Sequence, residues 1–309
     1  MIRWPVHPPT RVPPFSQPLS TQWVRQVPPF FQPAPPSVSV GSLHGEGEMR
    51  RSAGTGPEGR VPPASQPLSS QSHTQVPPFF PGKRYRGVAT LTLPPPLPVT
   101  ASLDGALRAR LSCRRFDGGP ISLQDLASLL GGAYGVGDAV AVRGLDAGWL
   151  RQRPVPSAGN AYPLEIYLLI RAVAGVEPGT YHFDAAGHRL ERIRGPVPWP
   201  RTVALCQGQP YVAGASALVV LSAVLDRTLP RYGDRGRRFV LLEAGHLGQN
   251  LYLLAAALGL GCLAVGGADD AALAAILDLD PGREPPLYAL AIGRPSTTDR
   301  ARARDLVQE

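Results

Sequence analysis

Proline is distributed so unevenly along this chain that its two parts cannot fold in the same way. Half of its 36 prolines fall within residues 1–83, and the other half are spread over the rest of the 309 residues. Proline fixes φ and has no backbone N–H to donate, so a stretch this rich in proline disfavours both helices and sheet ladders. We expect an extended, polyproline-II-like and mostly disordered tail over residues 1–83, followed by a folded domain over 84–309.

The tail contains an internal repeat. Residues 12–20 recur at 61–69, and residues 26–31 recur at 75–80, each at an offset of 49 positions (61 − 12 and 75 − 26). Two copies without a periodic apolar face are too few for a solenoid. The tail is therefore either a docking arm for a proline-binding module or a linker.

The net charge of +8 does not indicate a nucleic-acid-binding protein. The tail carries 7 basic and 3 acidic residues, and the remainder carries 24 and 20, so that each part contributes +4. Arginine supplies nearly all of the positive charge, because Lys83 is the only lysine. No interleaving of aromatic and basic residues of the kind that binds single strands is present. The domain after residue 83 also lacks a lysine that could act as a catalyst.

The cysteines and apolar segments predict a cytoplasmic protein. Cys113, Cys206 and Cys262 lie far apart without metal-binding or redox spacing, which is typical of reduced thiols in a cytosolic protein. Met1 to Pro9 has no apolar segment of a secretory signal. The apolar run Leu251–Ala268 contains four glycines, so a core helix followed by a buried strand explains it better than a membrane span does.

Hydrophobic periodicity in the domain predicts an α+β layered fold. The expected helices cover 103–111, 121–130 and 239–260, and the last of these is apolar nearly all round and should be buried on most faces. Ser122 should cap the second helix, with Asp125 three residues later, and Gly131-Gly132 should end it. The expected strands cover 164–170, a hairpin of 179–184 and 188–193, 217–224, 263–265 and 287–292.

Arg110, Ser112 and Arg114 stand at alternate positions ahead of the second helix. In an extended segment alternate side chains point the same way, so two guanidinium groups and a hydroxyl would share one face. Such a face matches a phosphate or an electron-rich heteroaromatic ring. A solvated basic edge strand would have the same pattern.

Two glycine-containing segments are further candidates for ligand contact. Ser157, Ala158, Gly159 and Asn160 precede a predicted strand, where glycine allows close approach and the polar side chains can bond a planar ligand, although an ordinary proline-framed turn is the alternative. Gly266 and Gly267 follow a strand and could offer backbone N–H groups to a ligand. The preceding glycines follow a helix and precede a strand, which is the wrong order for a dinucleotide-binding loop.

Arg231 and Tyr232 lie in an arginine-rich segment ahead of the long helix. Neighbouring cations would favour the phenolate of Tyr232 and so suit it to acid–base work. The alternative is a basic loop with one packed tyrosine.

Taken together and in this order, these motifs resemble the nitroreductase superfamily, and within it the SagB-type dehydrogenases of thiazole/oxazole-modified peptide biosynthesis. The resemblance covers roughly residues 85–309. The motifs that carry it are Arg110-x-Ser112-x-Arg114-x-Phe116, Pro156-Ser-Ala-Gly159 with Tyr162-Pro-Leu-Glu165, Gly179-x-Tyr181, Glu243-Ala-Gly-His-x-x-Gln-Asn250, Leu258-Gly-Leu-Gly261 and Ile292-Gly293.

The resemblance implies an FMN-binding α+β fold, with a central, mostly antiparallel sheet flanked by helices, and a homodimer with flavin at the subunit interface. By this resemblance, Arg110, Ser112 and Arg114 would contact the phosphate, ribityl and ring oxygens of FMN, and Ser157 to Asn160 would pack on the flavin from the other subunit. The N–H groups of Gly266 and Gly267 would lie near flavin N5 and O4. Gln249 and Arg302 would make further contacts. It also implies a peptide substrate and a cyclodehydratase complex as partners.

The implied reaction is oxidation of an azoline ring of a ribosomal peptide to an azole. The SagB-type branch has a Lys-Tyr pair ahead of the long helix, and here the pair is Arg231-Tyr232. Arginine keeps its proton at any working pH, so Tyr232 would have to remove the substrate proton, with Arg231 favouring its phenolate, while a hydride passes to FMN. The alternatives are an NAD(P)H-dependent nitroreductase or quinone reductase, and a flavin-free scaffold protein of a peptide-modification complex.

Overall fold

The computed structural model of the chain describes residues 82–137, 139–141 and 149–308. The chain divides into two units, residues 1–66 and 67–309, and every described residue belongs to the second unit. The expected proline-rich tail, up to residue 81, lies outside the described residues.

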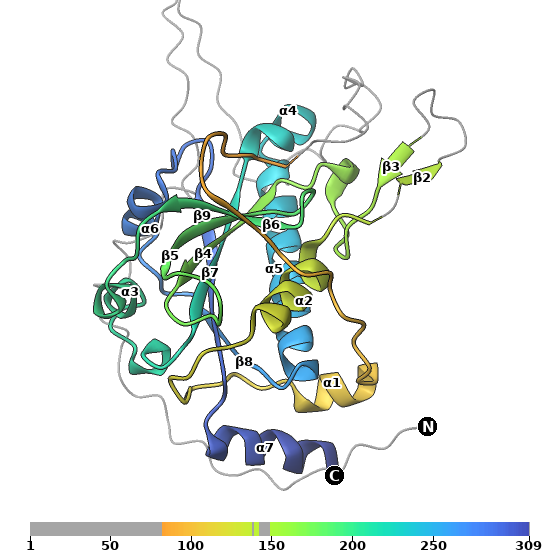
Figure 1. Cartoon of the computed structure of the whole chain (residues 1–309). Coiled ribbons are helices and arrows are strands. Elements are labelled where there is room, and N and C mark those ends of the chain that lie inside the picture. The colour runs from red at the N-terminus through yellow and green to blue at the C-terminus, as the bar shows by residue number, and fades with distance from the viewer. Residues whose placement is uncertain (1–81, 138, 142–148, 309) are drawn as a thin grey trace, which may run out of the picture. The chain divides into compact units, whose positions relative to one another are not determined.

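A seven-stranded antiparallel sheet forms the centre of the domain (Figure 1). Its strands lie in the order β1-β6-β5-β4-β7-β9-β8. They are β1 (Thr90–Thr92), β4 (Leu164–Ile170), β5 (Gly179–Asp184), β6 (Arg189–Arg194), β7 (Ala217–Ala223), β8 (Gly261–Val265) and β9 (Pro286–Gly293). A separate antiparallel pair consists of β2 (Ala139–Ala141) and β3 (Trp149–Arg151).

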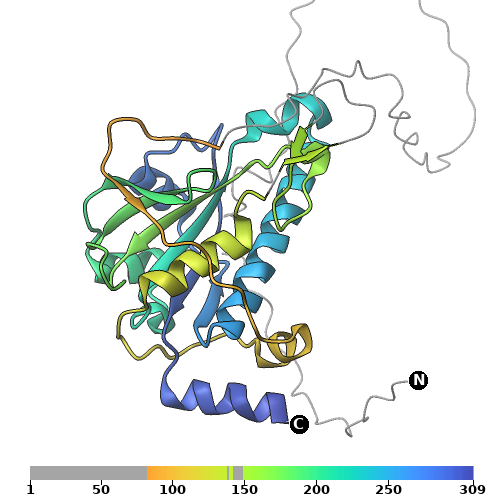
Figure 2. The same ribbon diagram turned by 45° about the vertical axis from the view of Figure 1, so that its right-hand side comes forward.

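Helices cover both faces of this sheet (Figures 1 and 2). The helices α2 and α5 lie against one face, whereas α3 and α6 pack with the buried residues of the other face. The helices are α1 (Leu103–Ala109), α2 (Leu123–Tyr134), α3 (Trp199–Leu205), α4 (Leu229–Tyr232), α5 (Arg235–Ala257), α6 (Asp270–Leu277) and α7 (Thr297–Gln308), with short 3₁₀ turns η4 (Ala158–Asn160), η5 (Pro210–Val212) and η6 (Leu225–Arg227). The prediction of an α+β layered domain is confirmed.

The central strands β4 and β7 are buried along their whole length. They pair with each other from Leu164 opposite Ala223 to Ile170 opposite Ala217. Successive side chains of a strand point to opposite faces, so burial of every residue requires a layer on each side, which the helices provide. This explains why the continuous apolar run at 164–170 correctly predicts a strand with those bounds.

The other predicted strands appear as the hairpin β5–β6 and as β7, β8 and β9, with shifts of one or two residues at some ends. The strands β1, β2 and β3 have three residues each and are too short to produce a periodic pattern. The helices α3, α4, α6 and α7 were also not predicted.

The helix α2 begins as expected but ends later. The backbone N–H of Asp125 donates to the Ser122 hydroxyl at 2.9 Å, so Ser122 is the N-cap. The prediction that Gly131-Gly132 ends this helix is wrong, because the helix continues to Tyr134. These glycines serve packing instead: a β-carbon at Gly131 would stand 2.5 Å from Pro96 Cγ, and one at Gly132 would stand 3.1 Å from a methyl carbon of Leu254.

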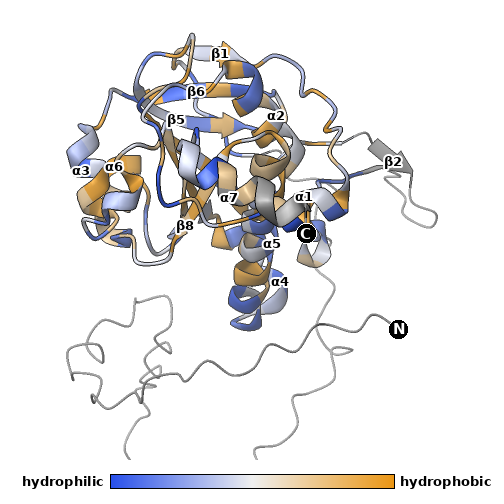
Figure 3. Cartoon of the chain, turned by 90° about the horizontal axis from the view of Figure 1, so that it is seen from below, coloured by the Kyte–Doolittle hydropathy of each residue, from blue (hydrophilic) through white to orange (hydrophobic). Residues whose placement is uncertain are grey.

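The long helix α5 is buried along one stripe only. Val240, Ala244, Leu247, Leu251 and Ala255 recur at the spacing of one helix face and are buried. The prediction of burial on most faces is wrong, since Leu242 is 55% exposed and polar positions recur between the apolar ones (Figure 3). The error arose because the overall apolar composition of a helix does not reveal which of its faces has a neighbour.

The apolar run Leu251–Ala268 is divided between the end of α5 and the strand β8, as expected. Within the described residues no helix is both long and apolar enough to cross a membrane. Cys113, Cys206 and Cys262 are buried free thiols.

The described chain begins against the sheet. Lys83 Nζ donates to Glu284 Oε2 at 2.7 Å and to the Tyr167 hydroxyl at 2.9 Å, and the Lys83 backbone N–H donates to Glu165 Oε1 at 2.8 Å. Lys83, which the sequence assigned to the tail, thus contacts the folded domain.

The same polar network continues into the sheet at His182. This fully buried ring lies between two carboxylates, with Nε2 2.9 Å from Glu165 Oε2 and Nδ1 3.0 Å from Glu191 Oε2. Burial lowers the pKa of His182, but the hydrogen bonds and charges of the two glutamates outweigh burial and raise it above its ordinary value. The two carboxyl groups therefore favour the protonated form of this buried histidine.

Candidate functional site

The segment that follows α1 runs along the edge strand β8. Ser112 forms a parallel bridge to Cys262, and the Cys113 N–H donates to the Cys262 carbonyl at 2.9 Å. The Ser112 hydroxyl lies 3.2 Å from the hydroxyl of Tyr252 on α5, and the Arg110 guanidinium carbon lies 5.7 Å from the centre of the Tyr252 ring. The structure therefore brings Arg110 and Ser112 together on Tyr252, a residue that the sequence analysis missed.

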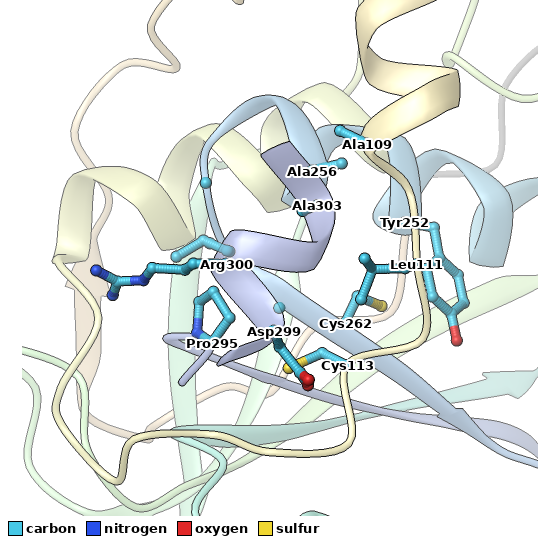
Figure 4. A pocket seen from close by; sticks show the side chains of 13 residues that line it. Ala109, Leu111, Cys113, Tyr252, Ala256, Cys262, Pro295, Asp299, Arg300 and Ala303 are labelled. Carbon is cyan, nitrogen blue, oxygen red and sulfur yellow. The ribbon is translucent and has the colours of Figure 1, made fainter. Parts of the chain in front are cut away.

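The intervening residues border a cavity whose lining also includes Tyr252 (Figure 4). Ala109, Leu111 and Cys113 line an apolar cavity of about 480 Å³ between the end of α5 and α7 (Figure 4). Burial raises the pKa of the Cys113 thiol to about 12, so this cysteine serves packing rather than chemistry. The segment is polar on one side and apolar on the other, as its alternation predicts.

Arg114 is tied to α7 through its backbone. The N–H groups of Arg114 and Arg115 donate to Asp299 Oδ2 at 3.0 and 3.1 Å. The exposed side chain of Arg114 borders a second hollow with Arg115 and Tyr211. Arg302 lies on α7, but its side chain is outside the described residues.

Gly266 and Gly267 follow β8 directly. Tyr252 reaches the same strand, because its hydroxyl accepts from the Ala264 N–H at 2.7 Å. Neither glycine N–H has an acceptor within the described part of the chain. A β-carbon at Gly267 would stand 2.8 Å from the side chain of Gln207, so backbone passes here where a side chain would not fit. We refer to Arg110, Ser112 and Arg114 of the segment along β8, together with Tyr252, Gly266 and Gly267, as the edge cluster.

A second cluster forms around η4. Gly159 has φ 62°, and Asn160 and Tyr162 also have positive φ, at 58° and 44°. Non-glycine residues seldom adopt this conformation, and such strain gathers at functional sites. Asn160 Nδ2 is buried and has no hydrogen-bond partner among the described residues.

Arg231 and Tyr232 lie directly against this strained loop. A β-carbon at Gly159 would stand 2.6 Å from the Tyr232 hydroxyl and 2.7 Å from Arg231 Nη1. The Arg231 guanidinium carbon lies 5.4 Å from the centre of the Tyr232 ring. The centre of this ring lies 5.1 Å from the centre of the Phe239 ring on α5, and the two rings are nearly perpendicular. We refer to Ser157–Asn160, Arg231 and Tyr232 as the loop cluster.

Buried polar side chains contact the loop cluster from the interior of the domain. Glu243 of α5 accepts from the Tyr134 hydroxyl at 3.1 Å and from the Ser157 hydroxyl, whose oxygen accepts from the Tyr162 N–H at 2.9 Å. Burial raises the pKa of Glu243 to about 7, although the hydrogen bonds from Ser157 and Tyr134 partly oppose the shift. The guanidinium of Arg153 lies 4.3 Å from the Tyr134 ring centre. Glu243 belongs to a motif quoted above, but nothing in the sequence indicated this contact.

The helix α5 separates the two clusters. Phe239 contacts Tyr232 at one end, and Tyr252 contacts Ser112 toward the other, 13 residues further on (252 − 239). At 1.5 Å per residue this separation is about 20 Å. Gln249 lies between them and is exposed. One chain therefore assembles Arg110, Ser112, Gly266 and Gly267 at one place and Ser157–Asn160 with Arg231 and Tyr232 at another, without joining the two.

The edge cluster offers the donor set that a flavin mononucleotide requires. Arg110 and Arg114 have no carboxylate partner for their side chains among the described residues, so both cations remain able to bind a phosphate. The Ser112 hydroxyl and the open N–H groups of Gly266 and Gly267 can donate to ribityl and ring oxygens. The residues present fit the cofactor that the sequence resemblance implies.

Comparison with known proteins agrees with this geometry. Residues 107–294, more than half of the chain, match the model of the "Nitroreductase family". The protein MJ1384 of Methanocaldococcus jannaschii, provisionally named a nitroreductase, is 38% identical over 192 residues, which are 62% of this chain and 90% of the relative. McbC of Escherichia coli, a microcin B17-processing protein, is 28% identical over 191 residues, which are 57% of this chain and 64% of McbC.

A crystal structure from Anabaena variabilis, also provisionally named a nitroreductase, superimposes with a TM-score of 0.57 at 26% identity. The match covers 67% of this chain and 42% of that chain. This chain thus spans less than two thirds of McbC and of the Anabaena protein. The expected nitroreductase-like fold is confirmed, and the likeness to McbC supports the resemblance to the SagB-type branch.

Proposed function

This chain belongs to the nitroreductase family, and we propose that it is an FMN-dependent oxidoreductase of the SagB type that oxidises azoline rings of a ribosomal peptide to azoles. The observation that carries the proposal is the edge cluster along one sheet edge. It has a hydroxyl, two arginines whose side chains have no carboxylate partner among the described residues, and two backbone N–H groups that have no acceptor among them. The likeness to a microcin-processing protein supports a peptide as the substrate.

Within the edge cluster, Arg110 and Arg114 bind the phosphate, with Arg302 as a further contributor, and Ser112 donates to the ribityl chain or ring. Gly266 and Gly267 would offer their N–H groups to the flavin ring, where fixed donors stabilise negative charge. When bound, FMN supplies the hydride acceptor of the reaction.

The loop cluster acts on the same flavin from a second copy of the chain. In one chain the two clusters are about 20 Å apart along α5, so Ser157–Asn160 and Tyr232 reach a flavin held by another copy's edge cluster. The face of α5 that carries Leu242 and Gln249 is exposed and free to contact that copy. In a symmetric homodimer, both sites are completed in the same way. A cyclodehydratase that forms the azoline is the further partner.

Tyr232 removes the proton from the azoline ring. Arg231 cannot be the base because its guanidinium stays protonated. Its guanidinium carbon lies 5.4 Å from the centre of the Tyr232 ring, which leaves the phenol hydroxyl as the group that accepts the proton. The substrate loses one proton to Tyr232 and one hydride, and becomes an aromatic azole. Molecular oxygen accepts the two electrons and is reduced to hydrogen peroxide.

The test is oxidation of a synthetic azoline peptide by the FMN-loaded protein. Mass spectrometry should record the loss of two hydrogen atoms per ring with the wild type. Tyr232→Phe should abolish this loss while retaining bound FMN. Tyr181→Phe removes a phenol hydroxyl outside both clusters and is the matched control. If Tyr232→Phe retains activity, Tyr232 is not the base.

A second candidate function is reduction of nitro or quinone compounds by NAD(P)H, favoured by the 38% identity to MJ1384. Rapid bleaching of the flavin by NAD(P)H without peptide would support it, especially if azoline peptides remain unchanged.

A further inference from the structure

Three exposed arginines next to the loop cluster have no carboxylate to pair with. Arg231, Arg235 and Arg238 form no ion pair with any described residue. The acidic residue of this stretch, Asp234, is 94% exposed and approaches Arg237 at 3.9 Å. The start of α5 is therefore a concentrated positive patch.

This patch lies next to Tyr232 along the chain, and one of its arginines contacts the Tyr232 ring. Arg231 lies against the Tyr232 ring, and the ring packs on Phe239. Arg235 is four residues before Phe239, and residues at this spacing are neighbours on a helix surface. Arg238 is adjacent to Phe239 in the chain. The positive N-terminal end of the α5 dipole adds to the same field.

Arginines elsewhere on the surface of the described domain differ in this respect. The guanidinium groups of Arg108, Arg192 and Arg294 each lie 2.9 Å from a carboxylate oxygen of Asp104, Glu177 and Asp117, respectively. Arg86, Arg114, Arg115 and Arg201 are also exposed without an ion pair to a described residue, so unpaired arginines are not confined to this patch. The patch is distinguished by having three of them within eight residues of the chain, next to Tyr232. The phosphate of FMN does not account for these three, since its proposed cations are those of the edge cluster.

We infer that the peptide oxidised at Tyr232 is anionic, with carboxylate side chains beside the reacting ring that pair with Arg231, Arg235 and Arg238. This inference rests on the proposed function and adds the charge of its substrate. Guanidinium groups pair with carboxylates through two parallel hydrogen bonds, which also orient the bound group. Because the patch is exposed, each pair contributes modestly and is screened by salt, but three pairs act together.

The test compares three labelled peptides that share one thiazoline ring and differ only in the flanking residues, which are glutamate, glutamine or lysine. Binding to the FMN-loaded protein is followed by fluorescence anisotropy, and ring oxidation is followed separately by mass spectrometry. At low salt the glutamate peptide should bind about tenfold more tightly than the glutamine peptide, and high salt should remove most of this difference.

Arg235→Glu/Arg238→Glu should reverse the order, so that the lysine peptide binds best. The control Arg86→Glu/Arg201→Glu makes the same change in net charge at two exposed positions, one ahead of β1 and one on α3, and should keep the wild-type order. Equal affinities for the three peptides, or an unchanged order in Arg235→Glu/Arg238→Glu, would overturn the inference.

Binding and chemistry can fail separately. If the glutamate peptide binds in an arginine-dependent way but no peptide is oxidised, the anionic ligand stands and azoline oxidation falls. If all three peptides are oxidised with equal affinity, azoline oxidation stands and the anionic preference falls.

Discussion

The α-carbon of Gly159 lies so close to Tyr232 that a β-carbon there would stand 2.6 Å from the phenol oxygen. The two residues are 73 positions apart in the chain (232 − 159), and this contact joins the strained loop before β4 to the segment before α5. The absence of a side chain at Gly159 thus sets the position of the proposed base.

Gly159→Ala should destabilise the protein and displace Tyr232. The substitution places alanine at φ 62°, which costs about 1–2 kcal/mol, and adds a steric clash that costs about 1–3 kcal/mol more. Gly175→Ala is the matched control, because Gly175 has φ 78° but nothing within 4 Å of a β-carbon. Urea denaturation of both variants isolates the clash. Equal losses of stability would mean that Tyr232 and Arg231 move aside freely.

Arg110→Ala and Tyr232→Phe should each be inactive alone but active when mixed. In a mixed dimer both defects fall on one site, and the other site is intact. With random pairing about a quarter of the wild-type activity should return. Mixing either variant with Arg110→Ala/Tyr232→Phe should restore nothing. Activity that stays absent in the first mixture, despite exchange of subunits, would contradict a site shared between two copies.

Glu243 should make the protein less stable as pH rises toward neutrality. Its pKa is raised to about 7 in the folded protein from an ordinary value of 4.5, so between these values the folded state holds a proton that the unfolded state has lost. The stability that this proton supplies is fully present below about pH 4.5 and is lost as pH rises through 7, by at most about 3 kcal/mol.

Denaturation at several pH values should therefore show a loss of stability across this range that Glu243→Gln lacks. Glu177→Gln, at a carboxylate whose side chain is 77% exposed, should behave as the wild type does. A Glu243→Gln variant with the wild-type pH dependence would show that this carboxyl is not the group that titrates.

Lys83→Met should cost about 1–3 kcal/mol of stability, because it leaves the buried Glu284 carboxylate without its cation. Arg84→Met removes the neighbouring cation, whose side chain is 57% exposed and whose partner Asp184 keeps Arg189, and should cost less than about 1 kcal/mol. Thermal denaturation of the two variants gives the comparison. Equal effects would mean that Lys83 does not fasten residues 82–85 to the sheet.

The parts of this structure that the sequence predicted are those that depend on local pattern. The run at 164–170 is apolar throughout and is a strand buried on both sides, and Ser122 caps α2 through a contact three residues away. Alternation also placed Arg110 and Ser112 on one side of their segment.

Contacts between distant segments were not accessible in the same way. Gly131 looks like a helix terminator, but it is needed where Pro96 crosses α2. Tyr252 and Glu243 have the spacing of ordinary helix residues, and their roles appear only once β8 and the loop after β3 are in place. The cofactor was predicted from the resemblance to a family, whereas the separation of the two clusters became visible only in the packing of the structure.

The visible absorption spectrum of the purified protein, with the released chromophore identified by mass, tests the central claim most directly. Flavin bands and a released molecule with the mass of FMN are the predicted result, and Arg110→Ala should weaken both. A colourless protein that does not take up added FMN would contradict the account and would favour a flavin-free scaffold in a peptide-modification complex.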